Sequence, residues 1–299
     1  MTLQRTLRRQ VTCAGIGLHS GHKVNLTLKP APADSGIRFR RSDLGTEIPA
    51  SVLHLSGTNH ATGLTHNGAT VETVEHLLAA LVSMGIDNVV VELDHREVPV
   101  MDGSAAPFVY LLQEAGVKTQ GSPRRYLKVL RPITVSRGDK LMSLYPSDHF
   151  KVSYSISFDH PLLRHQSQTM EVTETSFVDD IAPARTFGFL HEVELLRQQG
   201  LALGGSLENA IVLSETGVLN NQLRFEDEFV RHKILDAIGD LALVGYPLIG
   251  HLVAHRAGHA LHTAFAKRLL DEPDAWTIVE RAPEPSAVAA PMGVPAKAA

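Results

Sequence analysis

Residues 223–241 read LRFEDEFVRHKILDAIGDL, and their pattern predicts one long helix with a buried face. Apolar side chains recur there at helical spacing, as in a helix that packs on a core. These side chains are Phe229, Ile234, Leu235, Ile238 and Leu241. A polar stripe follows the same helix at every fourth residue. It consists of Glu228, His232, Asp236 and Asp240.

This polar stripe could hold a metal ion. Residues i and i+4 lie one turn apart on the same face of a helix, so His232 and Asp236 could bind one metal together. The alternative is a hydrogen bond between the two side chains on a solvated face. Taken alone, the spacing is more typical of the hydrogen bond.

A second segment with chemical potential is residues 73–81, TVEHLLAAL, where the apolar spacing predicts a helix over residues 73–84. Glu75 and His76 fall in its first turn. A glutamate beside a metal-binding histidine can serve as a general base, because it can reach water on the metal. The alternative is an acidic residue favoured by the helix dipole next to an incidental histidine, and the segment alone favours that alternative.

A third segment is residues 255–262, HRAGHALH, which predicts a glycine turn followed by a helix. His259 falls near the start of this helix, where the protonated form is disfavoured unless a carboxylate lies nearby. Asp240, one turn beyond Asp236, is the candidate partner. Taken alone, the segment is more typical of a structural histidine.

The composition excludes several classes of protein. Hydrophobic residues make up 43% and charged residues 20%, with a net charge of -4, which argues against nucleic acid as the main partner. Cys13 is the single cysteine, so a metal site must use histidine and carboxylate ligands. The sequence has no apolar N-terminal segment typical of secretion and no stretch long enough to span a bilayer. We therefore expect a cytoplasmic protein without a membrane span.

Strand and helix patterns divide the chain into two similar halves. Strands are expected at residues 6–12, 24–28, 37–41, 89–93, 126–130, 141–145 and 151–158. Helices are expected at residues 73–84, 105–115, 189–199, 226–244 and 258–270. Residues 119–123, TQGSP, have the composition of a linker. We therefore predict an α+β fold with domains at residues 1–120 and 126–280 and a disordered tail at residues 281–299.

Together, seven blocks of the sequence resemble the UDP-3-O-acyl-N-acetylglucosamine deacetylases of lipid A synthesis. The blocks occur in the family's order, and the resemblance extends over roughly residues 4–280. They are residues 15–21 (GIGLHSG), 73–77 (TVEHL), 98–104 (VPVMDGS), 184–189 (ARTFGF), 203–206 (LGGS), 224–241 (RFEDEFVRHKILDAIGDL) and 257–260 (AGHA). The match weakens at residues 58–62, TNHAT, where the family usually has apolar residues and often a cysteine.

The resemblance implies a catalytic zinc bound by His76, His232 and Asp236, with the fourth position left to water. Three protein ligands and an open position are what catalytic zinc requires. Iron(II) could fill the same ligands. By resemblance, Glu75 takes a proton from the water as it attacks the N-acetyl carbonyl.

The same resemblance assigns the remaining catalytic roles. The Thr186 hydroxyl would help to hold the oxyanion. His259, kept cationic by Asp240, would protonate the leaving glucosamine nitrogen. The products would be acetate and the free amine.

Substrate contacts also follow from the resemblance. Lys140, Arg256 and His19 match positions associated with the sugar and diphosphate, and Lys233 is expected to contact substrate oxygens. Phe158 matches an aromatic residue that stacks on uracil. Residues 190–203, which include Leu201, match an apolar passage for the acyl chain together with Leu18, and Phe187 lies beside it. The expected partner is thus an acylated UDP-sugar.

The family fold consists of two similar two-layer domains, each with a β-sheet packed against helices and with the active site between them. Transient contact with a membrane surface is compatible with such a substrate, and the sequence does not determine the oligomeric state. One alternative is a zinc amidase that acts on another acylated sugar or peptide; Phe158, Lys140 and Arg256 argue against it. A zinc-stabilised binding protein would need a closed site with four ligands, whereas three are expected here.

Overall fold

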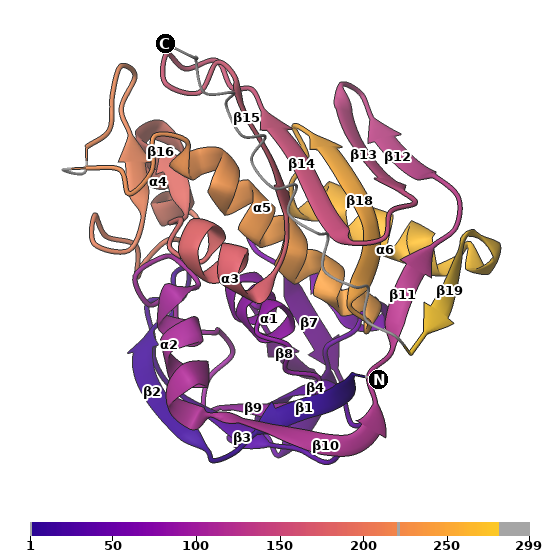
Figure 1. Ribbon diagram of the computed structural model, residues 1–299. Helices are drawn as coiled ribbons and strands as arrows, with labels where there is room; N and C mark the ends of the chain where they lie inside the picture. Colours follow the sequence, from indigo (N-terminus) through magenta and orange to yellow (C-terminus); the bar gives the residue numbers. More distant parts are fainter. Residues whose placement is uncertain (1, 220–221, 281–299) are drawn as a thin grey trace, which may run out of the picture.

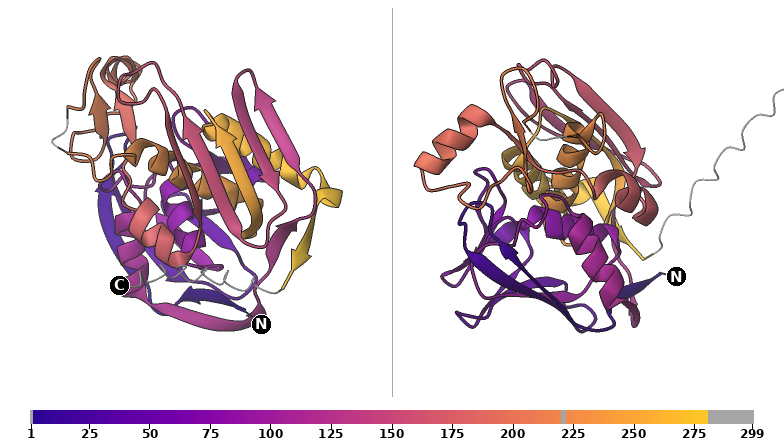
Figure 2. Two further views of the ribbon diagram at one scale, coloured as in Figure 1. Left: turned by 45° about the horizontal axis from the view of Figure 1, so that its top comes forward. Right: turned by 90° about the vertical axis from the view of Figure 1, so that its left-hand side faces the viewer.

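The computed structural model describes residues 2–219 and 222–280, and it has the predicted α+β architecture (Figure 1). Sheets lie on the outside, and helices from both halves of the chain fill the space between them (Figures 1 and 2). Within the described residues, every ladder joins strands of the same half. The division into two domains at residues 1–120 and 126–280 stays a prediction, and the tail expected at residues 281–299 lies outside the described residues.

The main sheet of the first half has five strands in the order β2-β3-β9-β4-β5. Their bounds are β2 (Val11–Ile16), β3 (Lys23–Pro30), β9 (Val89–Leu93), β4 (Ile37–Arg41) and β5 (Thr46–Pro49). Alternate side chains of β9, Val89, Val91 and Leu93, are buried, as expected for a sheet with one face on a core. Two smaller sheets complete this half. They contain β6 (Leu55–Gly57), β7 (Gly63–His66) and β8 (Ala69–Val71), and β1 (Leu3–Leu7) with β10 (Val117–Pro123).

The second half is built on a sheet of seven strands centred on β18 (Leu248–His255). The other strands are β11 (Tyr126–Val129), β12 (Ile133–Arg137), β13 (Lys140–Tyr145), β14 (Phe150–Ile156), β15 (Gln166–Glu171) and β19 (Trp276–Val279). A separate pair of parallel strands is formed by β16 (Phe187–Phe189) and β17 (Ile211–Leu213). The α-helices of the described residues are α1 (Glu75–Ser83), α2 (Ala106–Ala115), α3 (Glu174–Ser176), α4 (Leu190–Gln198), α5 (Glu228–Leu241) and α6 (His259–Leu270).

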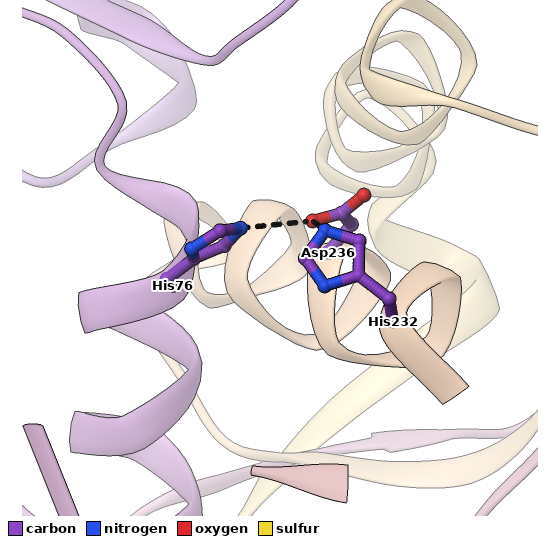
Figure 3. Close-up of side chains that lie close together, drawn as sticks. All are labelled: His76, His232 and Asp236. Atoms are coloured by element: carbon purple, nitrogen blue, oxygen red, sulfur yellow. Dashed lines mark ion pairs between the residues drawn. The ribbon is translucent and has the colours of Figure 1, made fainter. Parts of the chain in front are cut away.

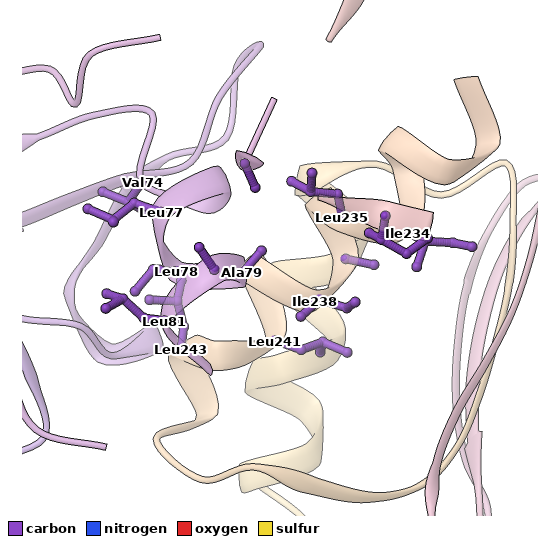
Figure 4. Close-up of a cluster of buried hydrophobic side chains, with 14 of the residues drawn as sticks. Val74, Leu77, Leu78, Ala79, Leu81, Ile234, Leu235, Ile238, Leu241 and Leu243 are labelled. Carbon is purple, nitrogen blue, oxygen red and sulfur yellow. The ribbon is translucent and has the colours of Figure 1, made fainter. Parts of the chain in front are cut away.

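Helices α1 and α5 pack against each other where the two halves meet (Figure 4). Apolar side chains fill the space around the two helices, among them Leu77, Leu81, Leu235 and Ile238. The helices are in close backbone contact at Gly239, where a Cβ atom would collide with the backbone carbonyl of Glu75. This contact holds the start of α1 against the last turn of α5, and the side chains that matter for function come from these two helices.

The predicted elements agree with the structure apart from two larger differences and shifts of a few residues at the ends of elements. The strand expected at residues 6–12 is two strands, because β1 ends at Leu7 and β2 begins at Val11. The linker expected at residues 119–123 is wrong, because this stretch belongs to β10 and pairs with β1. Its glycine falls where the register shifts and its proline ends the strand, positions that a strand tolerates. The helix expected at residues 73–84 begins only at Glu75.

Candidate metal and catalytic site

Three predicted metal ligands meet between α1 and α5. His76 Nε2 lies 3.5 Å from Asp236 Oδ1, and His232 Nε2 lies 3.3 Å from the same oxygen. Figure 3 shows His76 on α1 facing His232 and Asp236 on α5. One ligand atom from each of the three lies within 4.8 Å of the others, as a shared ion requires. The spacing of four residues places His232 and Asp236 on one face of α5.

The protonation and hydrogen bonds of these residues fit a cation. Asp236 Oδ1 is buried and has no hydrogen-bond partner among the described residues. His232 Nδ1 lies 3.0 Å from the Ala184 carbonyl oxygen, so it donates there and leaves the lone pair of Nε2 facing Asp236. Burial lowers the pKa of His232 to about 3, so the imidazole is neutral and can act as a ligand. The alternative of a solvated His–Asp pair is wrong, because both residues are buried.

Glu75 lies beside this group of three and is itself buried. Its Oε2 accepts a hydrogen bond of 3.1 Å from the backbone N–H of Thr62, and its Oε1 lies 4.0 Å from His259 Nε2. Burial raises the pKa of Glu75, which brings the carboxyl group closer to the range where a base both accepts and releases a proton. A glutamate placed only to complement a helix dipole would be exposed at the surface, and Glu75 is not.

His259 is the first residue of α6, and its partner is the predicted one. Its Nδ1 lies 2.8 Å from Asp240 Oδ2, and its Nε2 lies 3.8 Å from Asp236 Oδ2. Burial disfavours the imidazolium, but the negative charges of Asp240 and Asp236 outweigh this effect and raise the pKa of His259 to about 9. The ring is therefore positively charged at neutral pH and holds a proton on the nitrogen that faces the metal ligands.

A cavity of about 180 Å³ opens over these side chains. Thr186, Leu18, Phe187 and Lys233 line it together with the ligands, Glu75 and His259. Lys233 Nζ lies 2.8 Å from Asp236 Oδ2 and 5.5 Å from the centre of the Phe187 ring. A larger cavity of about 520 Å³ lies elsewhere and is lined by none of the predicted site residues, so size alone does not identify the site.

His19 lies in the turn between β2 and β3. Both of its ring nitrogens are buried without a hydrogen-bond partner among the described residues, and burial lowers its pKa. Its ring lies 6.4 Å from that of His60, which lines the cavity. Two carboxylate oxygens of Glu97 accept the backbone N–H groups of His19 and Ser20 and so fix this turn.

Three other predicted substrate contacts, Lys140, Arg256 and Phe158, are not among the residues that line this cavity. Lys140 begins β13 and Arg256 follows β18, and the pairing of Leu141 with His255 brings these two exposed cations to the same edge of the sheet. Arg256 forms an ion pair of 2.8 Å with the exposed Asp139. The Phe158 ring packs 6.0 Å from that of Phe187, a residue that lines the cavity.

The predicted acyl passage lies beside the β2–β3 turn. The N–H of Leu203 donates to the His19 carbonyl, and the N–H of Gly204 donates to the Leu18 carbonyl. Leu201 is half-buried, whereas Leu195 and Leu203 are 54% and 55% exposed. Leu195 and Leu203 therefore face outward, whereas Leu201 is partly packed.

Three residues near the site were not identified from the sequence: Thr62, His262 and Tyr154. Thr62 is fully buried and joins Glu75 to Asp240, because its N–H donates to the first and its hydroxyl to the second. His262 Nδ1 lies 2.8 Å from Asp240, and its Nε2 lies 2.8 Å from the Tyr154 hydroxyl. His262 belongs to the HALH segment one turn after His259, and this spacing is the signal that could have indicated it.

Comparison with known proteins identifies the family of the chain. The family described as "UDP-3-O-acyl N-acetylglycosamine deacetylase" (LpxC) matches residues 4–271. A protein of that activity from Pseudomonas entomophila is 53% identical over 93% of this chain and 94% of its own length. Homologues with the same name from Acidithiobacillus ferrooxidans and Saccharophagus degradans are each 50% identical, over 94% and 93% of this chain and 94% of their own lengths. No described helix is long and apolar enough to cross a membrane.

Proposed function

Because the chain belongs to the family of UDP-3-O-acyl-N-acetylglucosamine deacetylases, we propose that His76, His232 and Asp236 hold the metal ion of this reaction. The enzyme is an amide hydrolase that removes the N-acetyl group of UDP-3-O-acyl-N-acetylglucosamine in lipid A synthesis. The observation that carries the site assignment is the buried Asp236 Oδ1, which faces both histidines and has no hydrogen-bond partner among the described residues.

The proposed metal is zinc. Two neutral imidazoles and one carboxylate are a usual ligand set for catalytic zinc, and iron(II) accepts the same set. A bound divalent cation would supply a Lewis acid that lowers the pKa of water and polarises the acetyl carbonyl. The described residues support this proposal with a second feature, because the Ala184 carbonyl fixes the tautomer of His232 that leaves Nε2 free.

Glu75 is the proposed general base. Its carboxylate accepts the proton of the attacking water, and the Thr62 N–H bound to Oε2 leaves Oε1 on the side of His259. The raised pKa of Glu75 supports this role, since a stronger base removes the proton more readily.

His259 is the proposed general acid. Nε2 carries the proton for the leaving amine, and Asp240 keeps the ring both oriented and charged. Thr186 lines the same cavity and has a hydroxyl that can donate to the carbonyl oxygen as negative charge develops. Together these residues release acetate and leave the glucosamine nitrogen as a free amine.

The proposed substrate contacts extend from this centre. Lys140, Arg256 and His19 would meet the sugar and diphosphate, and Lys233 would meet the substrate oxygens after leaving Asp236. Phe158 would contact the uracil. Leu18, Phe187 and Leu201 would line the path of the acyl chain, which is supported by the outward-facing leucines of this segment. We also propose the cytoplasm as the compartment and a transient contact with the membrane surface.

The assignment is tested by separating metal binding from turnover. We expect His76→Ala to lose the metal, whereas Glu75→Ala keeps it and loses most of kcat, because only the first removes a ligand. Metal content is measured by mass spectrometry of the purified enzyme, and turnover by the loss of acetyl mass from UDP-3-O-acyl-N-acetylglucosamine.

The matched control is Glu72→Ala, which removes a nearby carboxylate that pairs with Arg96 and is 35% exposed. It should leave both quantities unchanged. A Glu75→Ala enzyme with the kcat of the parent would contradict the assignment of the base, and a fully loaded His76→Ala enzyme would contradict the ligand set.

A further inference from the structure

The carboxylate of Asp240 is held by donors on both of its oxygens. Oδ1 accepts the Thr62 hydroxyl. Oδ2 lies 2.8 Å from His259 Nδ1 and 2.8 Å from His262 Nδ1. His259 and His262 are one turn apart on α6, so a single face of that helix presents both rings to the same oxygen. The proposed mechanism uses only one of these two histidines.

The hydrogen bonds determine where the protons of His262 are. Since Asp240 is ionised and accepts only, the Nδ1 atoms of both histidines must donate to it. In the neutral His262, Nε2 then has no proton and must accept, and the Tyr154 hydroxyl lies 2.8 Å away as the donor. His262 and Asp240 are 0% exposed and Tyr154 is 1% exposed, so no water competes for these bonds. Burial also raises the pKa of the Tyr154 phenol well above its ordinary value, which keeps it a donor.

We propose that His262 and Tyr154 are positioning residues for the deacetylation: the chain Tyr154–His262–Asp240 orients the carboxylate that holds His259. This inference rests on the proposed role of the Asp240–His259 pair. With His262 in place, Asp240 Oδ2 is tied to α6 and, through Tyr154, to β14 of the sheet. The carboxylate plane is thereby fixed, and with it the direction in which His259 Nε2 points toward Glu75 and Asp236.

We expect His262 and Tyr154 to affect turnover and not substrate binding. His262 and Tyr154 do not line the cavity above the metal ligands, so neither contacts the substrate. A hydrogen bond to a charged group contributes about 1.5–3 kcal/mol, which corresponds to a factor of roughly 10 to 100 in a rate. We expect this factor in kcat, with KM and the metal content unchanged.

Two substitutions of His262 distinguish its role as a hydrogen-bond donor to Asp240 from its role in packing. His262→Leu keeps an apolar side chain but removes the donor to Asp240, and kcat should fall about 10- to 100-fold. His262→Asn retains an N–H at a similar place and should restore most of kcat. Tyr154→Phe removes only the outer hydrogen bond, so its kcat should fall less than that of His262→Leu. Steady-state kinetics, metal content and thermal unfolding are measured for each.

The control for lost packing is Phe265→Leu, which shortens another fully buried side chain of α6 without a polar contact. It should lower the unfolding temperature and leave kcat unchanged. If His262→Leu does not fold, the comparison of Tyr154→Phe with Phe265→Leu carries the test. An unchanged kcat in Tyr154→Phe would then overturn the inference.

A double substitution distinguishes the positioning role of His262 from the proposed acid pair of Asp240 and His259, on which that role depends. If His262 acts through Asp240, adding His262→Leu to Asp240→Asn should cause no further loss of kcat. Multiplicative losses would overturn the inference, as would a His262→Leu enzyme with the kcat of the parent. An Asp240→Asn enzyme with the kcat of the parent would instead refute the proposed acid pair, and the two failures are therefore distinguishable.

Discussion

Gly239→Ala should damage the metal site although residue 239 is not a ligand. A Cβ atom at this position would collide with the carbonyl oxygen and carbon of Glu75, so α1 and α5 would have to move apart. The neighbour is backbone, which cannot rotate away as a flexible side chain would. Because His76 moves with α1 while His232 and Asp236 move with α5, the separation would pull the three ligands apart.

The size of the effect follows from two opposing terms. Alanine is favoured over glycine in a helix interior by about 1 kcal/mol. Overpacking costs about 1–3 kcal/mol, and contact with rigid backbone argues for about 3. The free energy of unfolding should therefore fall by about 2 kcal/mol. A displacement of about 1 Å between reacting groups can lower the rate by a factor of about 100. We therefore expect kcat to fall by up to about 100-fold even though the enzyme remains folded.

Denaturant unfolding, metal content and kcat are measured on the Gly239→Ala enzyme and on a control. Gly121→Ala is that control, because Gly121 lies in β10 with open space around its ideal Cβ position. It should change stability by less than about 0.5 kcal/mol, as surface substitutions usually do. A Gly239→Ala enzyme that is as stable and active as the control would refute the argument that the α1–α5 contact sets the distance between the ligands.

Two further predictions concern the surroundings of the site. Glu228→Ala should lower the free energy of unfolding by about 3–5 kcal/mol, because it leaves the buried Arg185 without its partner at 2.8 Å. A denaturant titration measures this change, and a loss below about 1 kcal/mol would show that the pair does not stabilise the fold. Leu201→Asn should lower kcat/KM for long acyl chains far more than for short ones, since each buried methylene contributes about 0.8 kcal/mol, and should leave the metal content unchanged; equal losses for all chain lengths would remove Leu201 from the passage.

The long helix and the positions of its polar residues could be predicted from the sequence because both depend on local spacing. The apolar residues of α5 repeat at helical intervals, and the same interval aligns His232 with Asp236. Spacing could not decide whether the pair was buried or solvated. Burial of the pair depends on the packing of α1 against α5. From the sequence, only the family resemblance of the seven blocks connected His76 with His232 and Asp236.

The contacts of Asp240 could not be predicted because they join distant parts of the chain. Thr62 and Asp240 are 178 residues apart, and Tyr154 and His262 are 108 residues apart. Neither Thr62 nor Tyr154 belongs to a local pattern that indicates a site. The strand β10 was missed for a related reason, since its pairing with β1 overrides the composition of glycine, serine and proline that is typical of a linker.

The short connection between β10 and β11 limits how the enzyme can admit its substrate. β10 ends at Pro123 and β11 begins at Tyr126, so two arginines form the whole connection, and the distance between the two strand ends is at most about 11 Å. Arg124 pairs with Asp87 of the first half and lies over the Tyr126 ring of the second. Arg125 is anchored in the same way.

Arg125 pairs with Asp34 of the first half, and its guanidinium lies over the Tyr246 ring of the second half. A short connection with ion pairs to the first half and ring contacts in the second restricts how far the halves can swing apart about it. We therefore expect the acylated sugar to enter a cleft that is already assembled, with any gating by the loops around it.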